Sequence, residues 1–327
     1  MQTLNLSLRP FSQDDYTDLT HLTNVTYPEY PITEEEIRGF DKRRDPKIRW
    51  HRLMLEQDGT PLGFGLFENM AWMFHPQKFF VEVNIHPDYR GQGLGTRLYK
   101  ALMSELASYK PTVIRTRVRE DMSSGVAFAQ KQGFTEDTRD FESRLDPNSL
   151  SFAHLEGLKE AIAKEGISFM RLDEYMRLEP DYKQKLYNLD MEVSKDVPYP
   201  EGESHTSPSF ETWTKNFFEN PNFQPEAHLL AMHQGDVIGF NSLWPTQAEP
   251  DCMYNGLTAV KREFRRKGIA KTLKLENLKW VRDQGYKVVK TWNNSQNKGM
   301  LAINEALGFK RQPAWIILKK VLHEDND

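Results

Sequence analysis

Two short glycine-containing segments carry residue types that could bind a phosphate group. The first is Arg90–Gly95, with the sequence RGQGLG, and the second is Arg265–Ala270, with the sequence RRKGIA. Each follows an apolar, strand-like run and opens an amphipathic helical pattern. Its backbone N–H groups would therefore lie unpaired at the positive end of a helix dipole. An anionic phosphate fits such a position, and the small residues let it approach the backbone.

The two segments belong to an internal repeat. They start 175 residues apart, and the pairs Gly133-Phe134 and Gly308-Phe309, which end the next helical pattern in each half, have the same separation. One such loop is equally compatible with a helix start that binds nothing, but two in register favour a shared ligand. The second half gains roughly fourteen residues before its central strands and almost none afterwards. Length variation before the central strands is typical of loops that bind a substrate, and constant length after them is typical of a cofactor-binding segment.

Other uses of a glycine loop do not match these segments. Neither has the Gly-x-Gly-x-x-Gly spacing of nicotinamide-binding folds or the Gly-Lys-Ser/Thr ending of nucleotide hydrolases.

The composition is that of a globular protein, with 38% hydrophobic and 28% charged residues in 327 residues, enough for two domains. A net charge of −4 with no basic stripe argues against nucleic acid as the main partner. Cys252 is the only cysteine, and the histidines have no ligand spacing, so we expect no disulfide and no metal. The first ten residues lack a signal-peptide pattern and no apolar run approaches membrane-spanning length, which predicts a soluble, cytoplasmic protein without a membrane partner.

Hydrophobic periodicity predicts the same order of elements in both halves. Strands are expected over residues 4–8, 50–55, 61–68, 79–85, 113–118 and 141–145, and again over 167–172, 227–232, 237–243, 256–260, 288–292 and 314–320. Helices are expected over residues 14–27, 32–40, 95–106, 124–131, 152–163, 269–282 and 298–306. This mixed order predicts an α/β (α+β) fold with one sheet per half. The predicted domains are residues 1–147 and 166–327, joined by a linker helix within 148–165.

At the two glycine segments the chain resembles the GNAT superfamily of acyl-CoA-dependent N-acyltransferases. The hallmark of that family is Arg/Gln-x-x-Gly-x-Gly/Ala after a central strand, and both segments satisfy it. The resemblance covers nearly the whole chain as two tandem modules, and it implies that each is a mixed, mainly antiparallel sheet flanked by helices. The second half is also similar to tandem members such as mycothiol synthase, through Thr291, Asn293, Asn297, Met300 and Asn304. A likeness of fold does not fix the substrate.

The resemblance implies acetyl-CoA (coenzyme A) as cofactor, with its pyrophosphate on each loop. The pantetheine arm would pair with strand backbone at Val83 and Ile85, or at Thr258 and Val260. In this family that strand carries a bulge, whose freed N–H can bond the thioester oxygen. Asn297 stands where the family usually places an asparagine that contacts coenzyme A. The remaining implied contacts are Arg90, Gly91, Gln92, Gly93, Leu94, Gly95 and Thr96, and Arg265, Arg266, Lys267, Gly268, Ile269, Ala270 and Lys271.

Two departures from the family pattern distinguish the halves. Many members have a tyrosine four residues before the final glycine, which protonates the leaving thiolate; Ala129 and Asn304 stand there. Alanine cannot transfer a proton, and asparagine donates a hydrogen bond without being an acid. Met122 occupies the position that Asn297 fills in the second half. The pattern therefore favours the second module as the active one, with Asn304 in its catalytic set.

An incoming amine arrives largely as ammonium and must lose a proton before it attacks. Glu82, on the central strand of the first half, is the candidate base; the alternative is an ordinary polar residue on a half-exposed strand face. Leu257 stands at the matching position of the second half. Asn293 could orient the acceptor or, alternatively, cap the next turn. Further candidates in the enlarged front segment, for which a solvated loop is the simpler interpretation, are Glu201, Glu203 and His205.

We therefore predict an N-acetyltransferase that moves an acetyl group from acetyl-CoA to a primary amine of a small molecule by direct attack. The protein would act as a monomer or homodimer. Two alternatives stay open: a non-catalytic or sensory CoA-binding protein, and a protein-lysine acetyltransferase.

Overall fold

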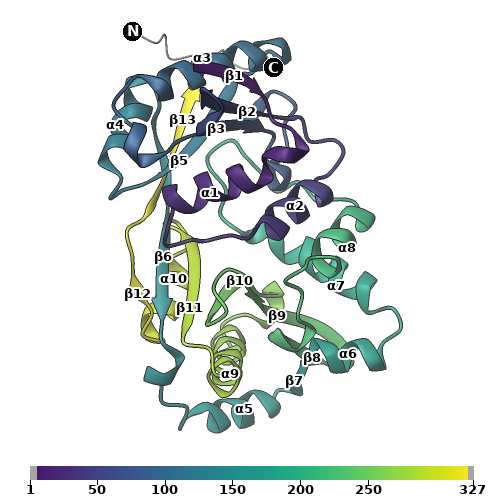
Figure 1. The fold of residues 1–327 in the computed structure, drawn as a ribbon. Coiled ribbons are helices and arrows are strands. Elements are labelled where there is room, and N and C mark those ends of the chain that lie inside the picture. Colours follow the sequence, from purple (N-terminus) through teal and green to yellow (C-terminus); the bar gives the residue numbers. More distant parts are fainter. Residues whose placement is uncertain (1–5, 323–327) are drawn as a thin grey trace. The chain divides into compact units, whose positions relative to one another are not determined.

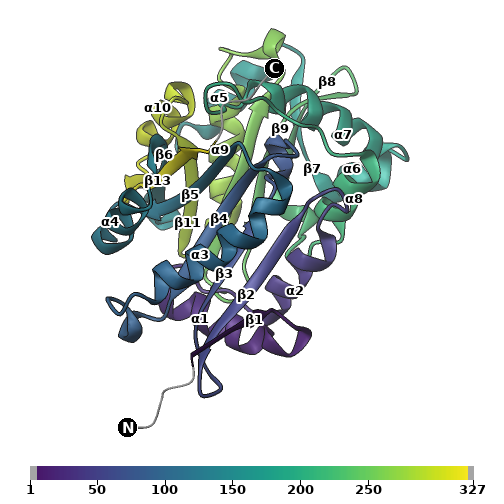
Figure 2. The ribbon, with the colours of Figure 1, turned by 90° about the horizontal axis from the view of Figure 1, so that it is seen from above.

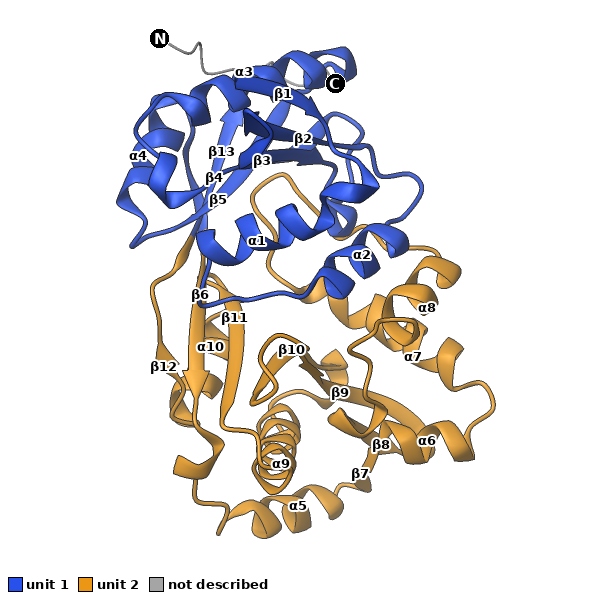
Figure 3. Cartoon of the chain, viewed as in Figure 1, with its two compact units in different colours: residues 1–138, 316–327 blue, residues 139–315 orange. Residues whose placement is uncertain are grey.

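A computed structural model of the chain describes residues 6–322 (Figure 1). The chain divides into two compact units (Figure 3): unit 1 comprises Met1–Thr138 and Ile316–Asp327, and unit 2 comprises Arg139–Trp315. The predicted first strand, over residues 4–8, begins outside the described residues and continues in β1, Leu6–Pro10. No helix in residues 6–322 combines the length and apolar character needed to cross a membrane.

Unit 1 is built on one sheet with the strand order β1-β2-β3-β4-β5-β13. Neighbours from β1 to β4 are antiparallel, whereas β4 and β5 are parallel. The strands after β1 are β2 (Trp50–Gln57), β3 (Thr60–Glu68), β4 (Lys78–Ile85), β5 (Val113–Arg119) and β13 (Trp315–Val321). The helices are α1 (Tyr16–Thr26), α2 (Glu34–Arg43), α3 (Leu94–Leu106) and α4 (Ser123–Lys131).

Both faces of this sheet are buried, because successive side chains of a strand point to opposite faces. Leu53 and Leu55 of β2 join a core with α3, whereas Met54 between them packs with α1 and α2. Helix α3 crosses β3 and β4 (Figure 2). A glycine permits this close crossing, since a Cβ at Gly65 would lie 2.6 Å from Cδ1 of Leu102.

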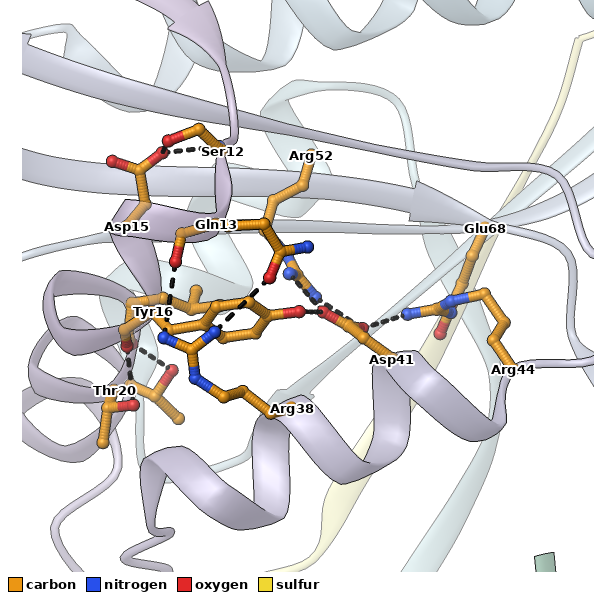
Figure 4. Close-up of polar contacts among 12 residues, drawn as sticks. Ser12, Gln13, Asp15, Tyr16, Thr20, Arg38, Asp41, Arg44, Arg52 and Glu68 are labelled. Carbon is orange, nitrogen blue, oxygen red and sulfur yellow. Dashed lines mark hydrogen bonds and ion pairs between the residues drawn. The ribbon is translucent and has the colours of Figure 1, made fainter. Parts of the chain in front are cut away.

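An ion network holds α2 against β2 in unit 1 (Figure 4). Asp41 of α2 accepts hydrogen bonds from Arg52 of β2 at 2.8 Å, from Tyr16 of α1 at 2.9 Å and from Arg44 at 2.6 Å. Burial alone would raise the pKa of Asp41, but the bonds from these donors, Arg52 foremost, hold it below its ordinary value. The helices that cover this face are thereby tied to the sheet by charge as well as by apolar packing.

Unit 2 repeats this plan with the strand order β6-β11-β10-β9-β8-β7, and β12 also pairs with β6. Strands β10 and β11 are parallel, like β4 and β5. Its strands are β6 (Thr135–Leu145), which starts in unit 1, β7 (Ile167–Arg171), β8 (His228–His233), β9 (Asp236–Pro245), β10 (Cys252–Val260), β11 (Val288–Asn294) and β12 (Lys310–Arg311). Its helices are α5 (Leu155–Ala163), α6 (Leu172–Leu178), α7 (Tyr182–Val193), α8 (Phe210–Phe218), α9 (Ile269–Asp283) and α10 (Lys298–Ala306).

The sheet of unit 2 is likewise covered on both faces. Leu230 and Met232 of β8 pack in a core with α6, α7 and α8, whereas Leu229 and Ala231 pack with α5 and α9. Trp213 of α8 is 6% exposed and belongs to the first of these cores.

The predicted fold class, with two modules in which a mixed, mainly antiparallel sheet is flanked by helices, is confirmed. Three details of the prediction differ from the structure. Strand β6 begins at Thr135 rather than Phe141, because the charged run at its start hides the alternation. Strand β10 begins at Cys252 rather than Gly256, because Gly256 marks a bulge inside the strand. Three helices before the central strands of the second half, α6, α7 and α8, were not predicted.

The last strand of each half belongs to the unit built mainly from the other half. The final strand, β13, is next to β5 in unit 1, and residues 140–145 of β6 pair antiparallel with β11 in unit 2. Residues 139–147 therefore group with unit 2. The predicted boundaries at 147 and 166 mark the ends of the sequence repeat, and the division into compact units does not test them.

Candidate functional site

The two glycine segments have the same backbone although their residues differ. Gly91 and Gly93 have φ of +79° and +81°, and the equivalent Arg266 and Gly268 have φ of +62° and +80°. Positive φ is ordinary for glycine and unfavourable for arginine, so the second loop keeps its form at a cost. No atom lies within 4 Å of a Cβ built on Gly91, Gly93 or Gly268, so the space above both loops is open.

Each loop leads directly into a helix that begins at a left-handed glycine. The first helical backbone bonds run from Arg97 N–H to the Gly93 carbonyl and from Thr272 N–H to the Gly268 carbonyl. The three N–H groups before each of these bonds have no partner in the helix itself and carry its positive dipole end. The residues that provide them are Leu94, Gly95 and Thr96 in unit 1, and Ile269, Ala270 and Lys271 in unit 2.

The first arginine of each motif holds the turn between strand and loop. Nε of Arg90 donates to the carbonyl of Ile85 at 3.0 Å, and Nε of Arg265 donates to the carbonyl of Val260 at 2.8 Å. Both carbonyls belong to the last residue of the central strand. The motif arginine therefore has a structural role in both units besides its charge.

Two cations of the second loop, Arg265 and Lys267, are paired with carboxylates. Asp196 accepts hydrogen bonds from Arg262 and Arg265, and Glu165 accepts one from Lys267 at 2.7 Å. The bonds from Arg262 lower the pKa of Asp196 to about 2, so the carboxylate stays ionised at neutral pH. These pairs are exposed and hold the loop cations in place without burying them.

The two parallel strands in each unit separate next to the loop. In unit 1 the pairing of β4 with β5 covers Lys78–Phe80 only, and in unit 2 the pairing of β10 with β11 ends at Asn255 and Thr291. The opening between them, which we call the fork, is where the resemblance places the pantetheine arm. The predicted bulge occurs in unit 2, where the register of β10 against β9 shifts between Asn255 and Thr258. In unit 1 the register of β4 against β3 runs without a shift from Phe80 to Ile85.

Unit 1 contains an open cleft of about 530 Å³ at its fork. Nearly all the residues predicted for the site in this half line it: Glu82, Val83, Ile85, Arg90, Gly91, Gly93, Leu94, Gly95 and Thr96. Gln92 is exposed on the same loop. Tyr27 of the segment after α1 and Arg117 of β5 line the cleft too. Burial, together with the charge of Glu82, raises the pKa of Tyr27, so its phenol stays neutral beside that carboxylate.

In unit 2 a network of buried polar side chains surrounds the bulge. Asn241 Nδ2 donates to Oδ1 of Asn255 at 3.1 Å and to Oγ1 of Thr258 at 2.7 Å. Asn277 of α9 in turn donates to Oδ1 of Asn241 at 2.7 Å. Asn241 and Asn277 are fully buried. A satisfied network of this kind gives the interior one defined arrangement.

Lys274 of α9 completes this network. Its side chain is 1% exposed, and its Nζ donates to Oδ1 of Asn255 at 2.9 Å and lies 5.3 Å from the ring of Phe309. Burial lowers the pKa of Lys274 to about 7. The matching residue in unit 1, 175 positions earlier, is Tyr99, which lines the cleft.

The structure brings together two of the three predicted catalytic residues. Nδ2 of Asn304 donates to Oδ1 of Asn293 at 2.6 Å, so Asn293 holds the last helix of unit 2. Oδ1 of Asn304 is buried without a partner in the described part of the chain, and such an atom is available to a ligand. Asn297, rather than Asn293, caps α10, through a bond from Met300 N–H at 3.2 Å. Glu82, the third candidate, lies in unit 1.

Sequence reasoning missed the polar network around the bulge, including Lys274. One signal was available: Lys274 and Asn277 fall on the apolar face of their helix, beside Leu273 and Leu278. Cys252 is a buried free thiol, and burial raises its pKa to about 12. Within residues 6–322 no three or more His, Cys, Asp or Glu side chains gather to hold a metal ion.

Comparisons with known proteins place the chain among acetyltransferases. The sequence profile of the acetyltransferase (GNAT) family matches residues 14–134 and 184–309, once in each half. An uncharacterised N-acetyltransferase of Methanocaldococcus jannaschii is 25% identical over 158 residues, which are 42% of this chain and only 65% of that protein. A GCN5-related N-acetyltransferase from Sphaerobacter thermophilus has a similar fold, with a TM-score of 0.72, 16% identity and 99% of both chains covered. A tandem GNAT protein of the clavulanic acid biosynthesis pathway is similar too, with a TM-score of 0.72, 20% identity, and coverage of 97% of this chain and 98% of that protein.

Proposed function

Because the chain belongs to the acetyltransferase (GNAT) family, whose profile matches both halves, we propose that it transfers an acetyl group from acetyl-CoA to a primary amine of a small molecule. The observation that carries this proposal is the pair of loops with one backbone form, each beside a fork between parallel strands. The second loop keeps that form with Arg266 at φ +62°, which is costly for a loop without a role.

The residues present fit the donor substrate. Open space lies above Gly91, Gly93 and Gly268, and the unpaired helix-start N–H groups suit a pyrophosphate. The cations Arg265, Arg266 and Lys267 add positive charge to the second loop. At the forks, the edges of β4 and β10 leave backbone groups for the pantetheine amides, at Val83 and Ile85 in unit 1 and at Thr258 and Val260 in unit 2.

We place the reaction in unit 2. The amine nitrogen bonds the acetyl carbonyl carbon, the carbon–sulfur bond breaks, and its electron pair leaves with sulfur as CoA thiolate. The neutral amine loses one proton as the amide forms, and that proton converts the thiolate to the CoA thiol. An N–H of the β10 bulge would bond the carbonyl oxygen as negative charge develops, an interaction typically worth about 3–4 kcal/mol. Asn304, with its free Oδ1 and its bond to Asn293, would orient a bound amide or amine beside the fork.

Calorimetry and a turnover assay test the proposal together. Titration with acetyl-CoA should give binding, and thiol release should follow when a panel of primary amines is added: a polyamine, an amino sugar and an amino acid. Mass spectrometry should find the acetylated amine. Binding of acetyl-CoA without acetylation of any small amine would contradict the small-molecule activity and favour a sensory CoA-binding protein. Acetylation confined to lysine peptides would favour a protein-lysine acetyltransferase.

A second candidate site is the cleft of unit 1. Its volume of about 530 Å³ and the carboxylate of Glu82 favour a ligand there as well. In that case Glu82 would serve as the base for an amine held beside Tyr27. The absence of a register shift between β3 and β4 at this fork is the reason for preferring unit 2.

A further inference from the structure

The bulge of β10 contains a peptide whose carbonyl is held by a side chain. Nδ2 of Asn255 donates to the carbonyl oxygen of Gly256 at 2.7 Å. That carbonyl belongs to the peptide unit that joins Gly256 to Leu257, inside the register shift. Since the peptide is trans, its N–H points away from its C=O. A bond that holds the Gly256 carbonyl therefore also sets the direction of the Leu257 N–H.

Asn255 can hold this peptide only if its own amide group cannot rotate. Two donors face its Oδ1: Nζ of Lys274 at 2.9 Å and Nδ2 of Asn241 at 3.1 Å. A rotated amide would direct its NH₂ group at both donors and leave the Gly256 carbonyl without its bond. Asn241 is itself fixed from α9 by Asn277 at 2.7 Å. Lys274 and Asn277 of α9 thus hold Asn241 and Asn255, and Asn255 holds the Gly256 carbonyl; we call this set of hydrogen bonds the clamp.

The fold of a unit does not require this lysine. Unit 1 has Tyr99 at the position of Lys274. Val81 corresponds to Asn255, because Val81 pairs with Phe67 of β3 as Asn255 pairs with Leu243 of β9 before the register shift. The central strand of unit 1 has no such shift. Both unit 1 residues lie in an apolar core. A fully buried ammonium group costs free energy that a tyrosine and a valine avoid. The lysine therefore occurs together with the bulge and not with the fold as such.

We propose that Lys274, acting through Asn255, is a positioning residue that directs the Leu257 N–H toward the thioester oxygen during acyl transfer in unit 2. The inference rests on the proposed function, because it assigns the oxyanion donor of that reaction. Lys274 itself forms no bond to substrate in this role. Its loss should lower the rate of the chemical step and leave the binding of acetyl-CoA nearly unchanged.

The sharpest variant is Asn255→Asp. The aspartate keeps an oxygen for Lys274 and pairs with its charge, so the network survives, but it has no N–H to donate to the Gly256 carbonyl. Lys274→Met removes the donor that orients Asn255. Lys274→Arg keeps a donor and should restore part of the activity. Lys279→Met is the matched control on the same helix, because Lys279 is half-exposed and bonds only Asp283 at the surface.

In the full-length protein, with acetyl-CoA and the amine that turns over fastest, Asn255→Asp and Lys274→Met should lower kcat about tenfold to a hundredfold. The KM for acetyl-CoA should stay within about twofold, and the control should match the wild type. Lys274→Met combined with Asn255→Val should be no slower than Asn255→Val alone, because both residues act on one peptide. Thermal unfolding checks each variant, and Asn255→Asp and Lys274→Arg decide the question if Lys274→Met does not fold.

Wild-type kcat in Asn255→Asp, or rate losses that multiply in the double variant, would overturn the inference. So would a large rise in the KM for acetyl-CoA at constant kcat. If the wild type acetylates no amine, the proposed function fails, and the clamp is then judged by NMR. Acetyl-CoA should shift the Leu257 amide signal in the wild type and not in Asn255→Asp; equal shifts in both would overturn the inference.

Discussion

The forks of the two units have loops with similar backbone conformations, but the side chains that line them differ in polarity. On one side of the fork, the side chains are apolar or aromatic in unit 1 and polar in unit 2. At matching positions unit 1 has Val81, Val83, Tyr99 and Ala129, and unit 2 has Asn255, Thr258, Lys274 and Asn304. The first set lines an open cleft. In the second set, Asn255, Thr258 and Lys274 belong to the hydrogen-bond network at the bulge, and Asn304 bonds Asn293. The units thus share the backbone conformation of the loop and differ in the side chains that line the fork.

The other face of each fork differs as well. Glu82 and Arg117 place charge in the cleft of unit 1. In unit 2, Trp292 occupies the position of Arg117 and stacks on Tyr254, with ring centroids 5.2 Å apart and planes nearly parallel. The two units therefore retain the same loop but surround the fork with residues of different character on both faces.

The largest effect should come from a carboxylate placed in one cradle at a time. Gly268→Asp puts a negative charge and a strained positive-φ side chain on the loop of unit 2. Two like charges about 4 Å apart repel by about 4 kcal/mol near a protein surface, so we expect kcat/KM for acetyl-CoA to fall about a thousandfold. Gly93→Asp makes the same change in unit 1 and should spare turnover while it removes any acetyl-CoA bound there. The reverse result, with Gly93→Asp inactive and Gly268→Asp active, would move the reaction to unit 1.

The next largest effect should be a change of the free energy of unfolding with pH, caused by the ionisation of Lys274. The folded pKa is about 7 and the unfolded value is 10.5, so both states are protonated below pH 7 and the full cost of burying the charge applies. As pH rises above 7 the folded state loses its proton first, and the free energy of unfolding increases, by about 2–3 kcal/mol between pH 7 and pH 9. Urea unfolding at the two pH values measures the difference in the wild type and in Lys274→Met. An equal difference in the variant would assign the pH dependence to other groups.

Much of the backbone of the two loops could be predicted from the sequence, because the pattern that specifies it is local. A glycine that starts a helix and an arginine five residues after a strand end, as in Arg90 and Arg265, are visible as spacing. The positive φ of Arg266 could not be predicted from its residue type. The only indication is that Arg266 matches Gly91 in the sequence repeat. The place of β13 beside β5 could not be predicted either, because two residues about two hundred positions apart leave no local pattern when they pair.

The hydrogen-bond partners of side chains at the fork were predicted less well than the conformation of the loop backbone. Asn293 and Asn304 were named separately, and the structure joins them by one hydrogen bond, whereas Asn297 was named for coenzyme A and its Oδ1 serves as a helix cap. Lys274 and Asn277 break the apolar face of their helix, but a long side chain such as that of Lys274 usually reaches solvent, so the pattern alone did not point to a buried network. The role of Lys274 depends on Asn255, nineteen residues away, which only the folded strand brings to it.

A smaller effect should follow from exchanging residues between the two loops. Arg266→Gly removes a side chain from a left-handed conformation and should stabilise unit 2 by about 1 kcal/mol. Gly91→Ala makes the opposite change in unit 1 and should destabilise it by about the same amount. Chemical denaturation with both variants measures the two shifts. Shifts of the same sign would mean that the loops do not share one backbone form in solution.

The smallest expected effect belongs to Glu82→Gln, which removes the charge in the cleft of unit 1 and keeps the shape of the side chain. The substituted amide would still accept the bond that Asn84 Nδ2 donates to Glu82 at 2.6 Å, so the cleft should remain folded. If unit 2 carries the reaction, kcat with the best amine should stay within about twofold of wild type, since no step there uses this carboxylate. If unit 1 carries it, the loss of a general base should lower kcat about 10²–10⁴-fold. A pH–rate profile separates a lost base from a lost contact, because only a lost base would remove the acidic limb of the profile. Glu82→Gln thus tests the carboxylate in the cleft of unit 1 and leaves the bulge of unit 2 untouched.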